Sequence, residues 1–167
     1  MTTADLLGDA FNRIADDASD IVTDLAQEQL SWRPNGRGNS IAWLIWHLTR
    51  VQDDHVSELA QLPQSWTDDD WHHRFGLDLD VSDTGFGHTP EQVAKVTADA
   101  ASLTGYLQDV TARTKLYLAS LGESDYPRIV DESWDPPVTL GVRLVSVVND
   151  DTQHVGQAAY VKGFLLD

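Results

Sequence analysis

Residues 149–157 read Asn-Asp-Asp-Thr-Gln-His-Val-Gly-Gln and lie inside the last long apolar-periodic segment of the chain. The apolar stripe of this segment continues on both sides of the polar stretch, through Leu140, Leu144, Val147, Val148, Ala158, Val161 and Leu165. Steps of three and four residues predict a helix that buries one face in a core. Asp150, Asp151 and His154 interrupt that buried face with groups that bind protons or metals. The stretch therefore predicts both a core helix and a site on it.

Three further segments have the same helical spacing, and together the four predict an all-α fold. They cover about residues 3–28, 40–61 and 90–121, and the last segment begins near Thr139. The third segment alternates steps of three and four, which is typical of the seam of a left-handed bundle. The simplest architecture is one four-helix-bundle domain over residues 1–167.

Local signals mark the ends of these segments. Thr89-Pro90-Glu91-Gln92 predicts a capping box and a helix start, and Gly122 predicts the end of that helix. Residues 62–88 and 123–138 are irregular connections, and neither contains a persuasive strand. A connection as long as the first usually packs over the body of a domain or contributes to a site.

Composition narrows the chemistry that the chain can carry. It has no cysteine, which excludes disulfides, zinc–thiolate sites and a protein thiol nucleophile. A metal site must then use His, Asp, Glu and water, and any thiol must come from a small molecule. No apolar run reaches the roughly 18 residues that a membrane span needs. The N-terminal residues lack the pattern of a signal peptide, so we expect no membrane partner and a cytoplasmic location.

The charge balance argues against nucleic acid as a partner. The chain carries 27 acidic and 11 basic residues, for a formal net charge of -16. Such a surface repels phosphate backbones and anionic membranes. The simplest reading of the acidity is that it keeps the protein in solution.

Two histidines on separate predicted helices form the core of a candidate site. His154 follows Asp150 by four residues and Asp151 by three, and helix geometry alone allows either carboxylate as its neighbour. His47 lies on or beside the buried stripe of the second segment. Two imidazoles and one carboxylate make a metal-binding set that leaves positions open for water or substrate. The alternative is a His–Asp hydrogen bond that merely satisfies a half-buried histidine.

Other polar residues would surround this centre. Asp54 follows His47 by seven residues on nearly the same side of the helix, and we consider it an extra ligand, a base acting on metal-bound water, or a solvated acid. Gln153 and Gln157 are outer-shell candidates on the last helix. We expect the remaining histidines to be surface, packing or capping groups, namely His55, His72, His73 and His88. For His88, a place in the lining of a cleft is the alternative to capping.

Four motifs, in order along the chain, resemble the DinB/YfiT-like superfamily and most closely its actinobacterial branch. They are Ile41-Ala42-Trp43-Leu44-Ile45-Trp46-His47-Leu48, Trp71-His72-His73-Arg74-Phe75-Gly76, Gly85-Phe86-Gly87-His88-Thr89, and Asp150 followed by His154-Val155-Gly156-Gln157. The resemblance implies a four-helix bundle, often dimeric, with a metal held by three histidines from the second and fourth helices. His47 and His154 match two of these, and Asp150 stands where relatives carry the third. The resemblance thus favours Asp150 over Asp151 as a ligand.

The same resemblance implies a function. Characterised relatives include metal-dependent transferases and isomerases that use low-molecular-weight thiols such as mycothiol or bacillithiol. We therefore expect a thiol-dependent S-transferase in detoxification or stress response, acting on a small-molecule electrophile as a homodimer. Zinc or nickel is the expected metal, with iron or manganese as alternatives, and Asp54 and Gln157 are the expected catalytic or substrate-side residues. The competing hypotheses are a metal-dependent hydrolase with Asp54 as base, and a non-catalytic metal-binding stress protein.

Overall fold

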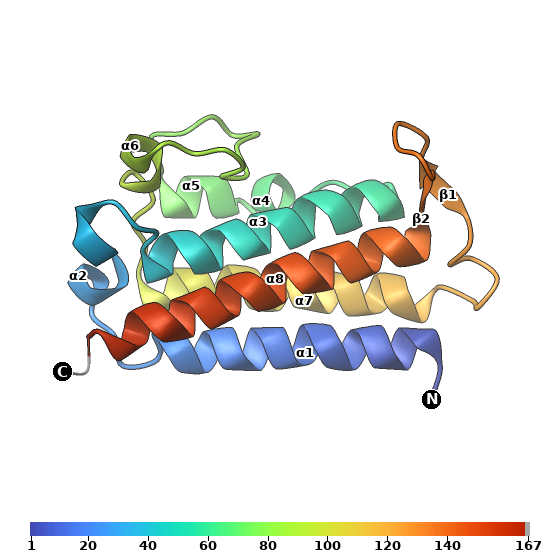
Figure 1. Ribbon diagram of the computed structural model, residues 1–167, viewed down its shortest axis with the longest axis horizontal. Coiled ribbons are helices and arrows are strands. Elements are labelled where there is room, and N and C mark those ends of the chain that lie inside the picture. Colours follow the sequence, from blue (N-terminus) through green and yellow to red (C-terminus); the bar gives the residue numbers. More distant parts are fainter. Residues whose placement is uncertain (166–167) are drawn as a thin grey trace.

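Four long helices form the body of the protein, as the sequence predicts. The computed structural model describes residues 1–165, so the last two residues of the expected 1–167 domain lie outside the described part. The long helices are α1 (Thr3–Val22), α3 (Ile41–Ala60), α7 (Ala100–Ala119) and α8 (Leu140–Gly163). Helix α3 packs on α7 and α8, and α1 packs on the same two helices from the other side (Figure 1). The expected all-α, four-helix architecture is confirmed.

The core lies between these helices and is built from the predicted stripes. Phe11, Leu44, Leu107 and Leu144 are almost completely buried. Helix α3 and helix α8 run in opposite directions side by side, so successive turns of one helix meet successive turns of the other (Figure 1). This pairing brings together the two polar patches that are about a hundred residues apart in the sequence.

Two of the expected helices are shorter than their apolar periodicity suggests. The helix expected over residues 3–28 ends at Val22, where Asp24 adopts a left-handed backbone with φ 65°, and α2 (Gln27–Leu30) is separate. The prediction of one helix over 90–121 is also wrong, because the structure has two helices there, α6 and α7 (Ala100–Ala119). The capping box at Thr89 forms, but it starts only α6 (Pro90–Val93).

The break between α6 and α7 has a local cause. The side chain of Asp99 accepts a hydrogen bond from the backbone N–H of Ser102 and so caps a new helix. The Lys95 ammonium contacts the Asp78 carboxylate at 2.8 Å, which holds the preceding turn against the long connection. Buried Val96 continues the core through this non-helical segment, so its place in the apolar pattern does not mark a helix.

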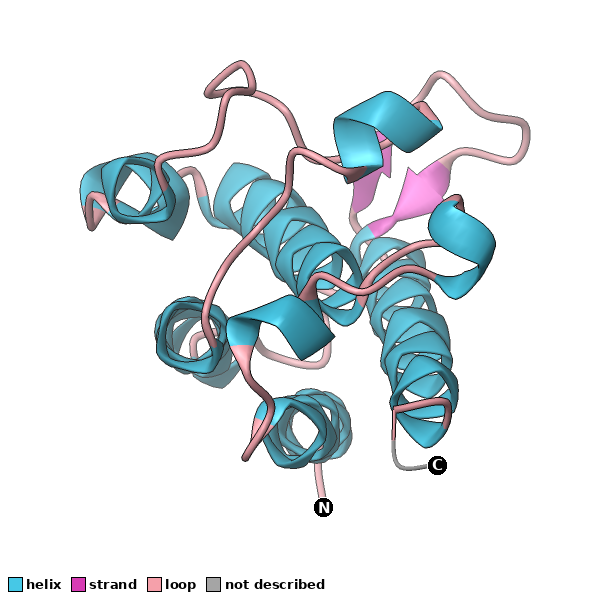
Figure 2. Ribbon diagram, turned by 90° about the vertical axis from the view of Figure 1, so that its left-hand side faces the viewer, coloured by secondary structure: helices cyan, strands magenta, loops and turns pink. Residues whose placement is uncertain are grey.

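A small antiparallel pair of strands corrects the expectation of no strand. β1 (Ile129–Asp131) pairs with β2 (Val138–Thr139), next to the start of α8 (Figure 2). Strands of this length leave no periodic signal in a sequence. The Arg143 guanidinium donates to the Asp131 carboxylate at 2.7 Å and ties β1 to α8. Thr139 caps α8, as the predicted helix start requires.

The first long connection packs over α3, as expected. It contains α4 (Ser65–Asp68) and α5 (Trp71–Phe75), while η1 (Pro34–Gly36) lies in the earlier loop that precedes α3 (Figure 1). The buried Asp53 carboxylate accepts hydrogen bonds from the backbone N–H groups of Ser65 and Trp66, at 3.0 and 2.8 Å. These bonds fix α4 against α3.

Within residues 1–165, no helix combines the length and the apolarity that crossing a bilayer demands.

Alanine substitutions at two glycines in helix interiors should change the free energy of unfolding in opposite directions. At Gly105 a Cβ would lie 2.6 Å from Cη2 of the buried Trp71 ring, whereas at Gly8 nothing lies within 4 Å. Gly8→Ala should raise the free energy of unfolding by about 0.5–1 kcal/mol through helix propensity. Gly105→Ala should lower it, because overpacking costs about 1–3 kcal/mol and outweighs that gain. Denaturant unfolding of both variants checks this, and equal stabilisation by both would refute the tight contact with Trp71.

Candidate metal centre

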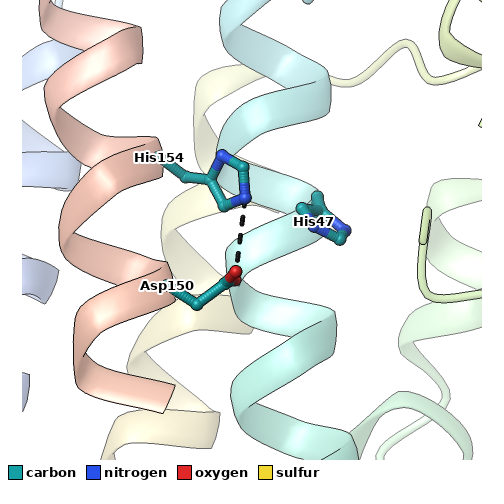
Figure 3. A group of neighbouring side chains, drawn as sticks. All are labelled: His47, Asp150 and His154. Carbon is teal, nitrogen blue, oxygen red and sulfur yellow. Dashed lines mark ion pairs between the residues drawn. The ribbon is translucent and has the colours of Figure 1, made fainter. Parts of the chain in front are cut away.

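The structure brings together the three residues that the sequence singles out as candidate ligands. His47 projects from α3, and Asp150 and His154 project toward it from consecutive turns of α8 (Figure 3). One potential ligand atom from each residue lies within 4.8 Å of the others. His154 Nε2 and Asp150 Oδ2 are 3.6 Å apart. The three side chains thus converge on one point between the two helices.

The ring of His47 is held in one orientation. Its Nδ1 lies 2.5 Å from the carbonyl oxygen of Thr84, and its ring stacks on Trp43 with centroids 4.5 Å apart. A carbonyl oxygen can only accept, so Nδ1 carries the proton and Nε2 keeps its lone pair. Burial lowers the pKa of His47, although the bond to Thr84 opposes this. The neutral imidazole that results is the form that binds metals.

His154 is oriented in the same way by a different partner. Its Nδ1 lies 3.2 Å from Oε1 of Gln157, one turn further along α8. An amide oxygen accepts, so Nδ1 of His154 can donate to it, and Nε2 of His154 is the atom that faces Asp150. Outer partners of this kind usually fix the tautomer of metal-binding histidines. Gln157 thus contacts the ring of His154, and its expected role at the centre stays a prediction.

The loop over residues 83–88 supplies a support that sequence reasoning missed. Gly85 has φ 91°, and a Cβ there would lie 2.8 Å from Nδ1 of His47 and 2.9 Å from the ring of Trp46. A side chain at this position would push the loop away from α3 and separate Thr84 from His47. The motif around Gly85 was visible in the sequence, but its contact with His47 was not.

His88 holds the same loop from the other end. Trp43 Nε1 donates to Nδ1 of His88 at 3.0 Å, and Nε2 of His88 lies 2.9 Å from both carboxylate oxygens of Asp83. The indole is only a donor, so the proton on His88 lies on Nε2 and is shared with Asp83. The His88 side chain is 2% exposed. It is thus a buried link between the loop and α3 rather than a cleft residue or a helix cap.

The two adjacent carboxylates have different surroundings. The side chain of Asp150 is 40% exposed, but its Oδ2 is buried and has no hydrogen-bond partner in the described part of the chain. Asp151 is completely buried, and burial raises the pKa of its carboxyl well above the usual range. Asp151 does not join the histidines. The geometry therefore favours Asp150 as the third ligand.

These residues fit a divalent metal. Tetrahedral bonds of about 2.0–2.1 Å place ligand atoms about 3.4 Å apart, close to the separation between His154 and Asp150. The three ligand atoms lie within 4.8 Å of one another, so binding one metal would draw the side chains closer together. A cation would also satisfy the unpartnered oxygen of Asp150, which is costly to bury alone. His154 and Asp150 are 16% and 40% exposed, so the centre is open to solvent on the α8 side.

The remaining acidic and histidine candidates lie apart from this centre. Asp54 is two helical turns, roughly 10 Å, along α3 from His47, and its carboxylate accepts a hydrogen bond from Gln64. Its role as ligand or base stays a prediction. A second group of potential ligands, Asp70, His72 and His73, is largely at the surface.

Comparisons with known proteins agree with this architecture. The family model described as the DinB superfamily matches residues 10–158. A crystal structure of a conserved protein from Enterococcus faecalis is similar over 97% of this chain and 96% of that chain, with 33% sequence identity and a TM-score of 0.90. No curated protein matches the chain.

Metal content should separate the two neighbouring aspartates. Asp150→Ala removes the buried oxygen that faces His154, so we expect it to lose bound metal after loading and desalting. Asp151→Asn should retain the wild-type metal content, because Asp151 lies outside the group of converging ligand atoms. Elemental analysis of both variants beside the wild type measures this. Metal retained by Asp150→Ala and lost by Asp151→Asn would reverse the assignment.

The stability of the metal-stripped protein should also depend on Asp151 in a defined pH window. In the unfolded chain this carboxyl ionises near its ordinary pKa of 3.8, whereas burial keeps it protonated in the folded chain. Above about pH 3.8 the unfolded state therefore loses a proton that the folded state retains, and folding stability falls with rising pH.

Asp151→Asn removes the ionisable carboxyl and with it this loss of folding stability at higher pH. Its free energy of unfolding relative to wild type should rise with pH above that point, by at most about 1.4 kcal/mol per pH unit. Denaturant unfolding from pH 4 to 8 measures the difference. A difference that stays constant with pH would show that Asp151 ionises normally in the folded protein.

Proposed function

The chain belongs to the DinB superfamily, and from this premise we propose that it is a divalent-metal-dependent S-transferase that uses a low-molecular-weight thiol of the mycothiol type. Its acceptor would be a small-molecule electrophile, and its role detoxification or stress response. Zinc or nickel is the proposed metal, with iron or manganese as alternatives.

One observation carries the metal-dependent part of this proposal. One ring nitrogen of His47 and one of His154 lie within 4.8 Å of each other and of a carboxylate oxygen of Asp150, and the Oδ2 atom of Asp150 is buried and has no hydrogen-bond partner among residues 1–165. A His–Asp hydrogen bond alone explains this arrangement less well. His154 Nε2 and Asp150 Oδ2 are 3.6 Å apart, which is too far for a good hydrogen bond. Such a bond also leaves the position of His47 beside these two residues unexplained.

The thiol-dependent part rests on composition and on the open side of the centre. The chain has no cysteine, so a thiolate nucleophile must enter from solution. A divalent cation bound there would lower the pKa of a coordinated thiol or water. The stacked rings of Trp43 and His47 close one side, and the half-exposed Asp150 leaves the other side accessible. Oε1 of the exposed Gln157 lies 3.2 Å from Nδ1 of His154.

The position of Asp54 bears on the competing hydrolase. A general base must come within hydrogen-bond reach of the water that it activates. Asp54 is roughly 10 Å along α3 from His47 and already accepts a hydrogen bond from Gln64 at 2.7 Å. This placement favours the transferase over a hydrolase with Asp54 as base. A homodimer, a cytoplasmic location and the absence of a nucleic-acid partner stay predictions.

Turnover assays separate the three functions. Metal-loaded protein is mixed with a series of small thiols and a chromogenic electrophile, and thioether formation is followed. We expect activity that needs both metal and thiol and that falls about 100-fold or more in His154→Ala, which lacks one imidazole. Turnover of esters or amides without thiol would support the hydrolase. Bound metal without turnover of either kind would support a non-catalytic stress protein and contradict the transferase.

A further inference from the structure

A second group of three potential metal ligands lies on the long connection that packs over α3. Asp70 immediately precedes α5, and His72 and His73 are the second and third residues of that helix. One potential ligand atom of each residue lies within 4.8 Å of the others, the same limit that holds at the candidate metal centre. Imidazole and carboxylate are donors that divalent transition metals bind. The group therefore has the composition and the spacing of a metal site of its own.

The ring of His72 is oriented by the same device as the ring of His47. Its Nδ1 lies 3.2 Å from the carbonyl oxygen of Trp66, just as Nδ1 of His47 contacts the carbonyl oxygen of Thr84. A carbonyl oxygen only accepts, so Nδ1 of His72 donates and Nε2 of the neutral ring keeps its lone pair. The backbone of Trp66 is itself fixed, because its N–H donates to the buried carboxylate of Asp53 at 2.8 Å. Backbone partners of this kind are typical of metal-binding histidines.

The other two side chains of the group are uncommitted. Asp70 occupies the N-cap position of α5, where aspartate commonly caps a helix, yet its carboxylate makes no capping hydrogen bond. Its Oδ1 lies 3.8 Å from Nε2 of His73, which is too far for a hydrogen bond. The rings of His72 and His73 are 3.8 Å apart between their centroids. A carboxylate and two imidazoles thus crowd together without bonding to one another, an arrangement that one shared cation would satisfy.

Both histidines also line a cavity of about 260 Å³. Its walls include Trp46 and Trp66, whose side chains are almost completely buried. A metal held by three protein ligands keeps at least one coordination position open for water or another small ligand. The cavity gives such a ligand a place directly beside the two imidazoles.

We propose that Asp70, His72 and His73 form a second binding site for a divalent transition metal such as nickel, copper or zinc. Two nitrogen donors and one carboxylate suit these ions, whereas calcium and magnesium take oxygen ligands. The site binds metal more weakly than the centre between α3 and α8, because the side chains of Asp70 and His73 are 63% and 73% exposed and water screens their attraction for the ion. Desalting therefore removes this metal. The inference rests on these three residues and not on the proposed thiol chemistry.

An equilibrium titration of the metal-free, full-length protein with nickel, followed by calorimetry, tests the second site. We expect one tight and one weaker equivalent in the wild type. Asp70→Asn, His72→Ala and His73→Ala should each weaken the weaker equivalent about tenfold or more, since even the loss of an outer partner of a ligand costs that much. The same three substitutions should leave the tight equivalent unchanged. His154→Ala should do the reverse.

Asp24→Asn is the matched control for Asp70→Asn. Both aspartates are exposed and have a left-handed backbone, with φ 65° at Asp24 and 63° at Asp70, and asparagine tolerates this conformation. Each substitution removes one carboxylate, but Asp24 belongs to neither group of ligands. Asp24→Asn should therefore titrate like the wild type. Circular dichroism of every variant verifies that the helices are intact.

The outcomes separate this site from the centre between α3 and α8. If no equivalent depends on Asp70, His72 and His73, or if Asp24→Asn weakens the same equivalent as strongly, the acidic surface holds an adventitious ion only and the inference is overturned. Absence of the equivalent that depends on His154, with the weaker equivalent retained, would count against the proposed function and leave the second site intact.

Discussion

The hydrogen bond between Nδ1 of His47 and the carbonyl of Thr84 is the contact on which the centre depends. It joins the second turn of α3 to a loop 37 residues further along the chain. The bond places the proton of His47 on Nδ1 and holds the ring 4.8 Å, between centroids, from the ring of His154 on α8. Gly85 permits the close approach, since any Cβ there would collide with His47 itself. Without this contact the two histidines would lie on facing helices but would not share a defined geometry.

The rest of the long connection serves to hold this loop in place. The buried guanidinium of Arg50 donates through Nε to the carbonyl of Asp83 at 3.1 Å, one residue before Thr84. The same guanidinium lies 3.8 Å from Asp53, which in turn anchors the start of α4. Removing one member of such a buried pair is expensive, because it leaves an uncompensated charge. The contacts of Arg50 and Asp53 with α4 and with the loop therefore help to keep the ring of His47 in place.

Sequence periodicity predicted four long helices, although it overran the bounds of two of them, and it put His47 and His154 on or beside buried stripes. It failed where local capping competes with an apolar pattern, as at Asp99, which starts a new helix inside a continuous run. It could not choose between Asp150 and Asp151, because both spacings fit one helix face. Resemblance chose Asp150, and the burial of Asp151 agrees with that choice. The contact between Thr84 and His47 could not be predicted, since Thr84 lies in an irregular connection without a period.

We propose that His47, Asp150 and His154 together bind one divalent metal. Anomalous diffraction from crystals of the metal-loaded protein, collected at the absorption edge of that metal, locates the ion. We expect one strong peak within bonding distance of a ring nitrogen of His47, a ring nitrogen of His154 and the carboxylate of Asp150. A metal found only at the surface group of Asp70, His72 and His73, or no peak between α3 and α8 after loading, would contradict it.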